Sequence, residues 1–339
     1  MRIHDDYSLL DNNTFGVDVK ADYFMEYDNV EELKQLLDTD LLRERRFLNI
    51  GGGSNILFVN DFHGVALHSC IKGIEKLEED EDKVTLRVGA GEIWDEFVQY
   101  CCDNSYGGAE NLSGIPGSVG AVPIQNIGAY GAEVKSIIKQ VECISASSGR
   151  AKTFSAEDCH FAYRDSIFKH RLKGKYIVTY VVFELKKSSW QPCTEYGSLS
   201  TEIKKYDKPT MQNIRLAVLD IRKRKLPEPK VLGNAGSFYT NPVIERTKYE
   251  KLKDQHPDMP CYEVSRNMVK VPAGWLIEQC GWKGRSVGKV AVHGSQALVL
   301  INKGGANGLD IINLSDQIRQ SVRDKFGIDL KLEVNIVFG

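Results

Sequence analysis

The segment Asn49-Ile50-Gly51-Gly52-Gly53-Ser54-Asn55 decides the first part of the fold. Its three glycines and serine follow directly on Arg46–Ile50, a short run that predicts a strand. Such a turn presents backbone N–H groups that can approach phosphate oxygens. A tight turn with positive φ would require the same glycines, so this segment alone favours phosphate binding and a purely structural turn about equally. The Gly-x-Gly-x-x-Gly pattern of Rossmann-type dinucleotide sites does not occur.

A small α/β lobe is expected around this turn, in residues 1–63. Asp28-Asn29-Val30-Glu31 has the pattern of a capping box and opens a predicted helix at Val30–Leu37. This helix and the strand at Arg46–Ile50 together predict the lobe.

A second lobe is expected in residues 64–209. The sequence favours strands from about Gly64 to Lys187, most clearly at Val84–Gly89 and Tyr176–Leu185. One predicted helix, near Ile93–Cys102, interrupts them.

A new domain is expected in residues 210–339. It opens with a helical pattern at Met211–Lys225, which Pro227 and Pro229 end. Further on, we predict a helix at Ala273–Cys280, a strand at Ala297–Ile301 and a long amphipathic helix. The apolar positions of that long helix are Ile311, Leu314, Ile318, Val322 and Phe326.

The end of the chain, Leu330–Val337, alternates as a half-buried strand does. Leu330, Leu332, Val334 and Ile336 would share the buried face. Lys331, Glu333 and Asn335 would then lie on the polar face.

Composition limits the classes of protein to which the chain can belong. Its 339 residues exceed the usual size of one domain, and 42% hydrophobic and 27% charged residues are typical of a soluble globular protein. The start, Met1-Arg2-Ile3-His4-Asp5-Asp6, lacks the basic region and apolar run of a secretory signal, which favours a cytoplasmic protein. A net charge of -2 gives no general attraction to nucleic acid or to an anionic membrane.

The cysteines and the basic residues carry weaker signals. Eight cysteines are scattered singly apart from Cys101-Cys102, so we expect reduced, mostly buried thiols, no disulfide framework and no metal. One basic cluster, Arg222-Lys223-Arg224-Lys225 with Lys230 beyond it, would by itself favour a solvated helix end over an anion site by about two to one.

A second glycine-rich element, from Gly107 to Gly131, has neither helical nor strand period and is long for an idle loop. It contains Gly114-Ile115-Pro116-Gly117-Ser118, Gly120-Ala121, Ile124-Gln125-Asn126 and Gly128. Small residues and proline would hold extended backbone against a large flat ligand, with Ser118, Gln125 and Asn126 as polar contacts. Together the two elements resemble the FAD-binding domain of the vanillyl-alcohol oxidase type. The resemblance implies an α+β fold, in which a two-lobed PCMH-type FAD-binding domain precedes an α+β C-terminal substrate-binding domain.

Further motifs match one enzyme family in order between Asn13 and Phe338. They are Phe161-Ala162-Tyr163-Arg164-Asp165-Ser166, Phe168-Lys169, Glu195-Tyr196-Gly197, Arg222 to Pro227, Gly233-Asn234-Ala235-Gly236-Ser237-Phe238, Ala273-Gly274-Trp275-Leu276-Ile277 and Lys331-Leu332-Glu333-Val334. With them the chain resembles the UDP-N-acetylenolpyruvoylglucosamine reductases, or UDP-N-acetylmuramate dehydrogenases. Cys261-Tyr262 and the segment up to Lys270 are similar to the longer form of that family, whose additional tyrosine closes over the substrate. Ala121 departs from members that carry a small hydroxyl residue there, which puts one polar contact in doubt.

The resemblance implies a reaction with non-covalent FAD and with NADPH as the reductant. In this family NADPH reduces the flavin, whose N5 passes hydride to the enolpyruvyl double bond of UDP-N-acetylglucosamine enolpyruvate. The product, UDP-N-acetylmuramate, is a peptidoglycan precursor. Arg164 matches the arginine beside the flavin and the substrate carboxylate, and Ser237 matches the proton donor to the enolate carbon. Glu333 matches a glutamate near that carboxylate, where we expect it to be protonated or to share a proton.

The resemblance also assigns binding residues. For FAD these are Gly51, Gly52, Gly53, Ser54, Asn55, Ile115, Pro116, Ser118, Ile124, Gln125, Gly128 and Arg164. For the substrate they are Tyr163, Tyr196, Lys225, Asn241, Tyr262, Lys283 and Gln296. The resemblance therefore favours a substrate-binding role for Lys225. Lys223 and Arg224 are still expected to be surface charges, and no role is assigned to Arg222. We expect a monomer.

Two other functions are weighed against this one. A flavin oxidase of the same superfamily would share Gly51 to Asn55 but is not expected to carry Arg164, Ser237 and Glu333 together. A catalytically idle nucleotide-sugar-binding module would lack one of those three. In an anonymous sequence Ser237 would most often be a turn hydroxyl, and Arg164 would pair with Asp165 or another carboxylate.

Overall fold

Segments from distant parts of the sequence pack together in this protein. The computed structural model describes all 339 residues, and their packing defines two units. Unit 1 comprises residues 1–7, 21–53 and 63–223, and unit 2 comprises residues 8–20, 54–62 and 224–339. The ranges 1–63, 64–209 and 210–339 remain a prediction of lobes along the chain. Helix α5 (Met211–Lys225), placed by the sequence in a new domain, packs in unit 1 as far as Lys223.

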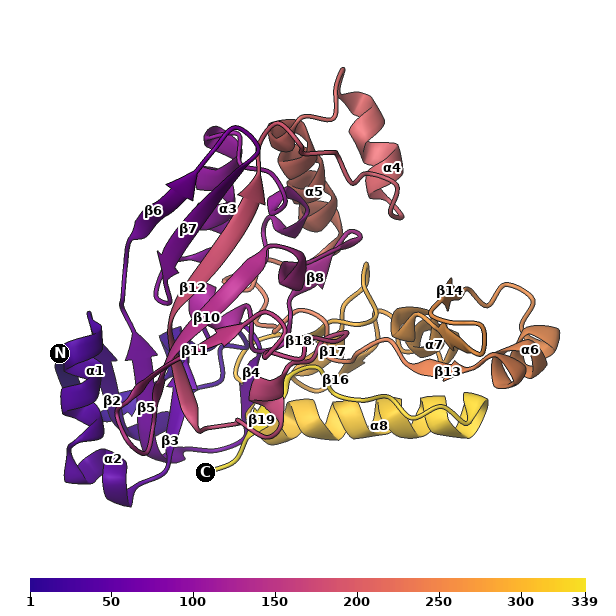
Figure 1. Ribbon diagram of the computed structural model, residues 1–339. Helices are drawn as coiled ribbons and strands as arrows, with labels where there is room; N and C mark the ends of the chain where they lie inside the picture. The colour runs from indigo at the N-terminus through magenta and orange to yellow at the C-terminus, as the bar shows by residue number, and fades with distance from the viewer. The chain divides into compact units, whose positions relative to one another are not determined.

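Unit 1 begins with a four-stranded sheet covered by two helices (Figure 1). The strand order is β1 (Arg2–Ser8), β2 (Lys20–Tyr27), β5 (Phe62–Ser69) and β3 (Phe47–Ile50). Helices α1 (Val30–Leu37) and α2 (Asp40–Glu44) bury leucines against Val65 and Leu67 of β5. Asn29 caps α1 by accepting a hydrogen bond from the Glu32 N–H at 2.9 Å, and the predicted bounds of this helix are confirmed.

The second sheet of unit 1 is antiparallel. Its strand order is β11 (Ala151–Ser155), β10 (Ile138–Ser145), β12 (Tyr176–Lys186), β7 (Lys83–Gly89) and β6 (Ile74–Glu79). Helix α3 (Trp94–Asp103) packs Trp94 and Phe97 on Phe183 of β12, with ring centroids 5.9 and 4.8 Å away. The strands and the helix predicted here are therefore present.

The glycine-rich element 107–131 forms short turns that are tied to α3 and to the end of β7. It contains two 3-10 turns, Glu110–Leu112 and Val119–Ala121, and ends in a small hairpin of β8 (Gly128–Ala129) and β9 (Ala132–Glu133). The Trp94 indole donates to the Leu112 carbonyl at 3.0 Å, and the Gly120 N–H donates to the Ala90 carbonyl at 2.9 Å. Because its backbone bonds to regular structure, the element has a fixed course although it has no period of its own.

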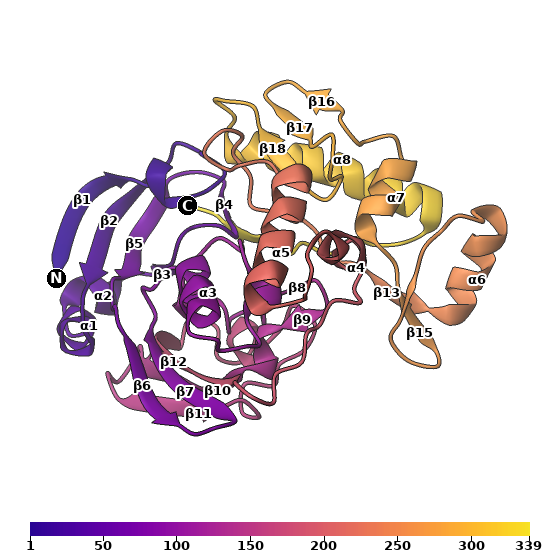
Figure 2. The ribbon, with the colours of Figure 1, turned by 90° about the horizontal axis from the view of Figure 1, so that it is seen from above.

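Unit 2 contains three small sheets and three main helices (Figure 2). The strands are β13 (Val243–Glu245), β15 (Met268–Lys270) and β14 (Tyr262–Glu263) in one sheet, and β16 (Ser286–Val287), β17 (Val290–Val292) and β18 (Leu300–Asn302) in another. The third sheet pairs β4 (Ile56–Phe58) in parallel with β19 (Asn335–Val337). The helices are α6 (Arg246–Gln255), α7 (Ala273–Gln279) and α8 (Gly308–Phe326), while the short α4 (Leu199–Glu202) belongs to unit 1.

Helix α8 confirms the long amphipathic helix of the sequence. All five predicted apolar positions are buried, and α8 lies along β17 and β18 (Figure 1). Asn307 and Asp310 form a reciprocal capping box at its start, and Gly327 ends it at φ +61°. The predicted strand 297–301 is shorter than expected, since β18 begins only at Leu300.

The prediction of a continuous last strand from Leu330 to Val337 is wrong. Only Asn335–Val337 forms β19, because β4 offers a partner of just three residues. Leu332 makes one isolated bridge to Tyr239 and is 36% exposed, whereas Leu330 and Val334 are buried as expected.

None of the helices has both the length and the apolar character required to cross a membrane.

Candidate functional site

The two glycine-rich elements touch each other in unit 1. A Cβ atom on Gly51 would lie 2.4 Å from the Ser118 Oγ, and one on Gly52 would lie 3.2 Å from the Gly117 Cα. Gly53 adopts φ +61°, which disfavours any other residue. The glycines therefore allow the turn after β3 to lie directly against the second element.

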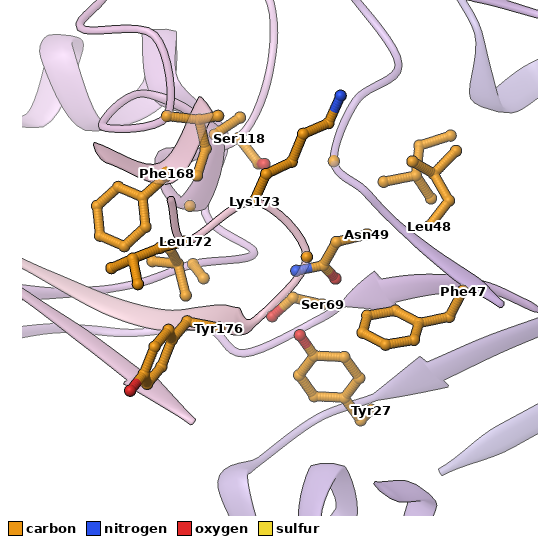
Figure 3. A pocket seen from close by; sticks show the side chains of 18 residues that line it. Tyr27, Phe47, Leu48, Asn49, Ser69, Ser118, Phe168, Leu172, Lys173 and Tyr176 are labelled. Carbon is orange, nitrogen blue, oxygen red and sulfur yellow. The ribbon is translucent and has the colours of Figure 1, made fainter. Parts of the chain in front are cut away.

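A cavity of about 270 Å³ opens beside this contact (Figure 3). Its walls carry large apolar groups, and polar side chains are interspersed among them. The residues of the two glycine-rich elements in the wall are Asn49, Ile50, Gly51, Ser118, Gly120, Ala121 and Ile124. The remaining lining residues are Tyr27, Phe47, Leu48, Ser69, Ala90, Phe168, Leu172, Lys173, Gly174, Tyr176 and Val178. Such a mixed cavity can hold a planar group between apolar walls and bind polar atoms at its edge.

One polar atom in this cavity wall lacks a partner. The hydroxyl of Tyr27 is fully buried and makes no hydrogen bond within the protein. In Figure 3 it points into the space toward Ser69 and Asn49, whereas the hydroxyl of Tyr176 points away. A buried unpaired hydroxyl lowers the free energy of unfolding by about 1 to 3 kcal/mol. A ligand atom that accepts a hydrogen bond from it would recover that loss.

Arg164 lies against the hairpin that ends the second glycine-rich element. Its guanidinium donates to the Gly128 carbonyl at 2.5 Å, and a Cβ on Gly128 would lie 2.8 Å from its Nη1. Arg164 adopts φ +54°, and Lys169 donates to its carbonyl at 3.0 Å. The neighbouring Asp165 binds His170 through both carboxylate oxygens at 2.8 Å. The guanidinium is thus fixed beside the Gly128 backbone by its own strained loop.

Asn126 does not fit the role of a free ligand contact. Its amide nitrogen donates to Glu133 at 3.0 Å and to the Ala162 carbonyl at 2.9 Å, and its oxygen accepts from the Lys135 N–H. The expectation that it offers polar contacts to a ligand is therefore corrected: the buried Asn126 joins the two segments that carry Gly128 and Arg164.

An ion pair between the half-buried Asp95 and the buried Arg215 anchors the other end of the element. Asp95 accepts two hydrogen bonds from Arg215 at 2.5 and 2.9 Å and one from the Gly114 N–H at 2.5 Å. Burial alone would raise the pKa of Asp95, but the bonds from Arg215 and Gly114 lower it below its usual value. Arg222, undecided from the sequence, lies close by, since a Cβ on Gly114 would be 3.0 Å from its Nε. Burial lowers the pKa of Arg222.

We expect Asp95→Asn to lower the free energy of unfolding by about 2 to 3 kcal/mol at pH 7, because it leaves the buried Arg215 charge unpaired. The folded-state pKa of Asp95 is depressed, so its contribution is complete above the unfolded-state pKa of about 3.9 and is lost as the pH falls through the folded value. Urea unfolding at several pH values measures this. The control, Glu31→Gln in the exposed Lys34 pair, should change stability by less than about 0.5 kcal/mol. A difference between wild type and Asp95→Asn that grows toward low pH would contradict the assignment.

In unit 2, three of the predicted residues lie on neighbouring backbone segments. Ser237 forms an isolated antiparallel β-bridge with Val299 through its backbone. The carbonyl of the adjacent Phe238 accepts a hydrogen bond from the Glu333 N–H at 2.9 Å. The Asn55 amide donates to the Glu333 carbonyl at 3.3 Å. Ser237 and Glu333 are half-buried, and Gly236 before them adopts φ +67°. The fold thus brings together the backbone segments that carry Ser237, Glu333 and Asn55, which lie far apart in the sequence.

The buried Asn234 fixes this segment. Its side-chain oxygen accepts from the Gly236 N–H at 3.0 Å, and its amide donates to the Leu232 carbonyl at 2.8 Å. Gly233 admits no side chain, because a Cβ would lie 2.1 Å from the Phe15 carbonyl oxygen. The Gly233–Phe238 motif is therefore shaped by packing as well as by any chemistry.

The predicted substrate residues have various partners in their own units. The Asn241 side chain accepts from the Ala273 N–H at 2.9 Å, and the Gln296 side chain accepts from the Leu298 N–H at 3.3 Å. Tyr262 is exposed on β14, with the Lys270 ammonium 5.8 Å from its ring centre. Lys283 pairs with Glu278 at 2.9 Å. Tyr196 is exposed in unit 1, where a Cβ on Gly131 would lie 3.1 Å from its Cβ.

Several residues at the site escape the sequence patterns. Tyr27, Ser69, Lys173 and the aromatic walls of the cavity come from strands and loops whose sequences resemble ordinary core or surface. Asp95 has the pattern of a first-turn helix acid. Among the aromatic residues that line the cavity, Phe168 lies inside a quoted family motif, Phe168-Lys169.

Comparison with known proteins defines the class to which this site belongs. Residues 21–155 match a model described as FAD binding domain, and residues 228–337 match a model described as UDP-N-acetylenolpyruvoylglucosamine reductase, C-terminal domain. The crystal structure of UDP-N-acetylenolpyruvylglucosamine reductase (MurB) from Thermus caldophilus has a similar fold, with a TM-score of 0.70, 24% identity and 99% of each chain covered. The protein is an FAD-dependent oxidoreductase with the two-lobed flavin domain and the α+β C-terminal domain that the sequence predicted.

Full-length relatives identify the family. A UDP-N-acetylenolpyruvoylglucosamine reductase from Bacteroides fragilis is 49% identical over 331 residues, which cover 98% of this chain and 99% of the relative. A protein of the same name from Flavobacterium johnsoniae is 43% identical over 339 residues and is covered completely. The chain belongs to the UDP-N-acetylenolpyruvoylglucosamine reductase family.

Proposed function

We propose that this protein reduces UDP-N-acetylglucosamine enolpyruvate to UDP-N-acetylmuramate, with bound FAD as the cofactor and NADPH as the reductant. The observation that carries the proposal is the junction of Ser237 with Glu333, where the carbonyl after Ser237 accepts the Glu333 N–H at 2.9 Å. A weak acid and a carboxyl group on adjoining segments suit the protonation of an enolate carbon. The relatives that are matched over nearly their whole length are named as reductases of this substrate class, which supports the same function.

The residues around the cavity fit FAD. The turn 51–53 carries no side chains because all three residues are glycine, so its N–H groups are suited to donate to phosphate oxygens. The cavity beside it offers apolar walls and the unpaired Tyr27 hydroxyl. We propose that Gly51 to Asn55 hold the diphosphate of FAD, and that Ile115, Pro116, Ser118, Ile124, Gln125 and Gly128 line its path. Bound FAD supplies the hydride-transfer chemistry.

The chain's own residues then handle charge and protons. Arg164, held at the Gly128 carbonyl, is proposed to stabilise the negative charge that develops on the substrate. Ser237 donates its hydroxyl proton to the enolate carbon. The hydroxyl is a weak acid, but the carbanion-like carbon is a stronger base than the serine alkoxide, so the transfer is favourable. Glu333 hydrogen-bonds the substrate carboxylate through a shared proton. Tyr163, Tyr196, Lys225, Asn241, Tyr262, Lys283 and Gln296 are proposed to hold the nucleotide sugar.

An anaerobic absorbance titration tests the function. The purified protein should show a bound-flavin spectrum that bleaches with NADPH and returns when UDP-N-acetylglucosamine enolpyruvate is added. A reduced flavin that oxygen reoxidises but the enolpyruvate does not would favour the oxidase alternative. A protein that binds no flavin after FAD is added would refute the proposal.

We expect Tyr27→Phe to weaken FAD binding about threefold to tenfold, because one hydrogen bond to the cofactor is lost. The stability of the FAD-free protein should stay the same or rise, since the unpaired buried hydroxyl disappears. Flavin fluorescence titration and thermal unfolding measure the two effects. Tyr176→Phe is the matched control, because its hydroxyl points away from the same cavity (Figure 3). Equal FAD affinity in Tyr27→Phe and wild type would disprove the contact.

We expect Glu333→Gln to reduce turnover and to remove one ionisation from its pH profile. Glutamine keeps the shape and a donor N–H but cannot exchange a proton, so a role as a shared-proton group predicts loss of the limb on which the carboxyl group titrates. Steady-state rates from pH 5 to 9 measure the profile. An unchanged profile in Glu333→Gln would exclude the shared proton.

A further inference from the structure

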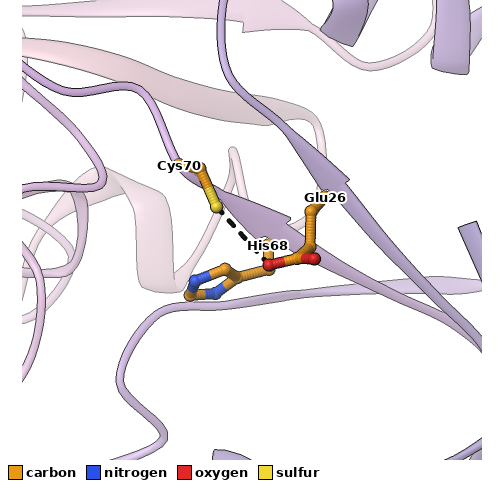
Figure 4. Close-up of side chains that lie close together, drawn as sticks. All are labelled: Glu26, His68 and Cys70. Carbon is orange, nitrogen blue, oxygen red and sulfur yellow. Dashed lines mark hydrogen bonds between the residues drawn. The ribbon is translucent and has the colours of Figure 1, made fainter. Parts of the chain in front are cut away.

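Three potential metal ligands, none of which belongs to a motif in the sequence, meet on the four-stranded sheet of unit 1. Glu26 lies near the end of β2, His68 near the end of the neighbouring β5, and Cys70 directly after β5 (Figure 4). One ligand atom from each lies within 4.8 Å of the others, and the Cys70 Sγ is 3.6 Å from a Glu26 oxygen. A tetrahedral Zn²⁺ with ligand bonds of about 2.0 to 2.3 Å places its ligand atoms roughly 3.5 Å apart. Small side-chain rotations would therefore suffice to surround one ion.

The His68 ring is held in a way that suits a metal ligand. Its Nδ1 lies 3.0 Å from the Ile50 carbonyl, and when Nδ1–H donates to that oxygen in the neutral ring, Nε2 is the nitrogen able to bind a metal. The ring also stacks on the buried Phe24, with centroids 5.9 Å apart. A carbonyl partner on the second ring nitrogen is the usual support of a metal-bound histidine, because it fixes the tautomer and the ring orientation.

A positive charge already occupies the edge of this cluster. The Arg2 guanidinium donates to Glu26 at 2.9 Å and to the Cys70 Sγ at 3.4 Å, and also to both oxygens of Asp28. The Arg2 side chain is 47% exposed and sits on β1, next to β2. It can thus withdraw from Glu26 and Cys70 while keeping Asp28 as a partner. His4, also on β1, places its Nε2 3.7 Å from the same Glu26 oxygen.

We propose that Glu26, His68 and Cys70 form a binding site for Zn²⁺ or a similar divalent cation, and that Arg2 competes with the metal for Glu26 and Cys70. A ligand set of thiolate, imidazole and carboxylate favours the binding of zinc over magnesium or calcium. The fourth position is open to water or to His4. The site faces away from the flavin cavity, since Ser69, between His68 and Cys70, is the residue of this segment that lines it. Its occupancy does not depend on the proposed function.

Calorimetric titration of the chelator-treated flavoprotein with ZnCl₂ tests the site. Wild type should bind one Zn²⁺ per chain, and both Cys70→Ser and His68→Gln should raise Kd at least about tenfold. Arg2→Gln should lower Kd about twofold to fivefold, the range expected when one exposed ionic competitor is removed. The matched control is Cys193→Ser, which removes the exposed thiol and should leave Kd unchanged.

Further outcomes separate a metal site from a simple ion pair. Co²⁺ should give a thiolate-to-metal absorption band in the difference spectrum of wild type and Cys193→Ser but not of Cys70→Ser. The proposal is overturned if wild type binds no stoichiometric Zn²⁺, or if Cys70→Ser binds it as well as wild type does. It is also overturned if Arg2→Gln weakens the binding, because Arg2 would then support the cluster and not compete for it.

Discussion

Ser237→Ala should still let NADPH bleach its flavin while overall turnover falls by about 10²-fold to 10⁴-fold, the usual contribution of a positioned general acid. The reason is that the proposed role of the hydroxyl, protonation of the enolate carbon, belongs only to the second half-reaction. Gly236 at φ +67° and the bridge to Val299 fix the Ser237 backbone, so alanine should not disturb the segment. Anaerobic stopped-flow absorbance measures each half-reaction separately.

The control for this variant is Ser148→Ala, which changes an exposed serine in the turn between β10 and β11 and should keep wild-type rates. Equal slowing of both half-reactions in Ser237→Ala would show that the residue positions the flavin or the nucleotide and does not donate the proton. Turnover within threefold of wild type would remove Ser237 from the mechanism.

Arg164→Lys should lower kcat/KM at least about 10²-fold although the positive charge is kept, as expected when a preorganised donor to developing charge is lost. A lysine ammonium is a single point charge and cannot bind the Gly128 carbonyl and the substrate with the two ends of a planar fork. The loss should fall mainly on flavin reoxidation by the enolpyruvate substrate. Steady-state kinetics and the two half-reactions measure it.

Arg150→Lys provides the control, because this arginine is exposed on the turn between β10 and β11 and should tolerate the exchange. If Arg164→Lys retains wild-type kcat/KM, charge alone is sufficient and the geometry of the guanidinium is irrelevant. If only FAD affinity falls, Arg164 belongs to the cofactor site and not to the reaction.

Much of the architecture could be predicted because its signals are local. The bounds of α1 and α5 follow from helical period, caps and prolines near each end, and the buried face of α8 follows from helical period alone. The turn after β3 could be located because three adjacent glycines disfavour the continuation of a strand or helix. The series of motifs between Asn13 and Phe338, which includes Arg164, Ser237 and Glu333, suggested the family, and the full-length relatives confirm it.

Other predictions failed or were impossible because they depend on which segments meet. Alternation predicted a long last strand, but β4 supplies only Ile56–Phe58 as its partner, so Leu332 stays exposed. Asn126 resembles a ligand contact in the sequence, and only its three hydrogen bonds reveal a structural role. No spacing rule connects Glu26 with His68 and Cys70, which adjacent strands bring together.

The sequence by itself determined the family, the two glycine-rich elements and the approximate limits of α1, α3, α5 and α7, because glycine conformation and helical period depend on neighbouring residues alone. Tertiary structure decided that Gly51 meets Ser118, that the Tyr27 hydroxyl is buried without a partner and that Asp95 holds both Arg215 and Gly114. It also decided that residues 8–20 and 54–62 pack with the C-terminal segment. Burial and hydrogen bonding between distant residues arise only when the chain closes on itself, so no local pattern in the sequence records them.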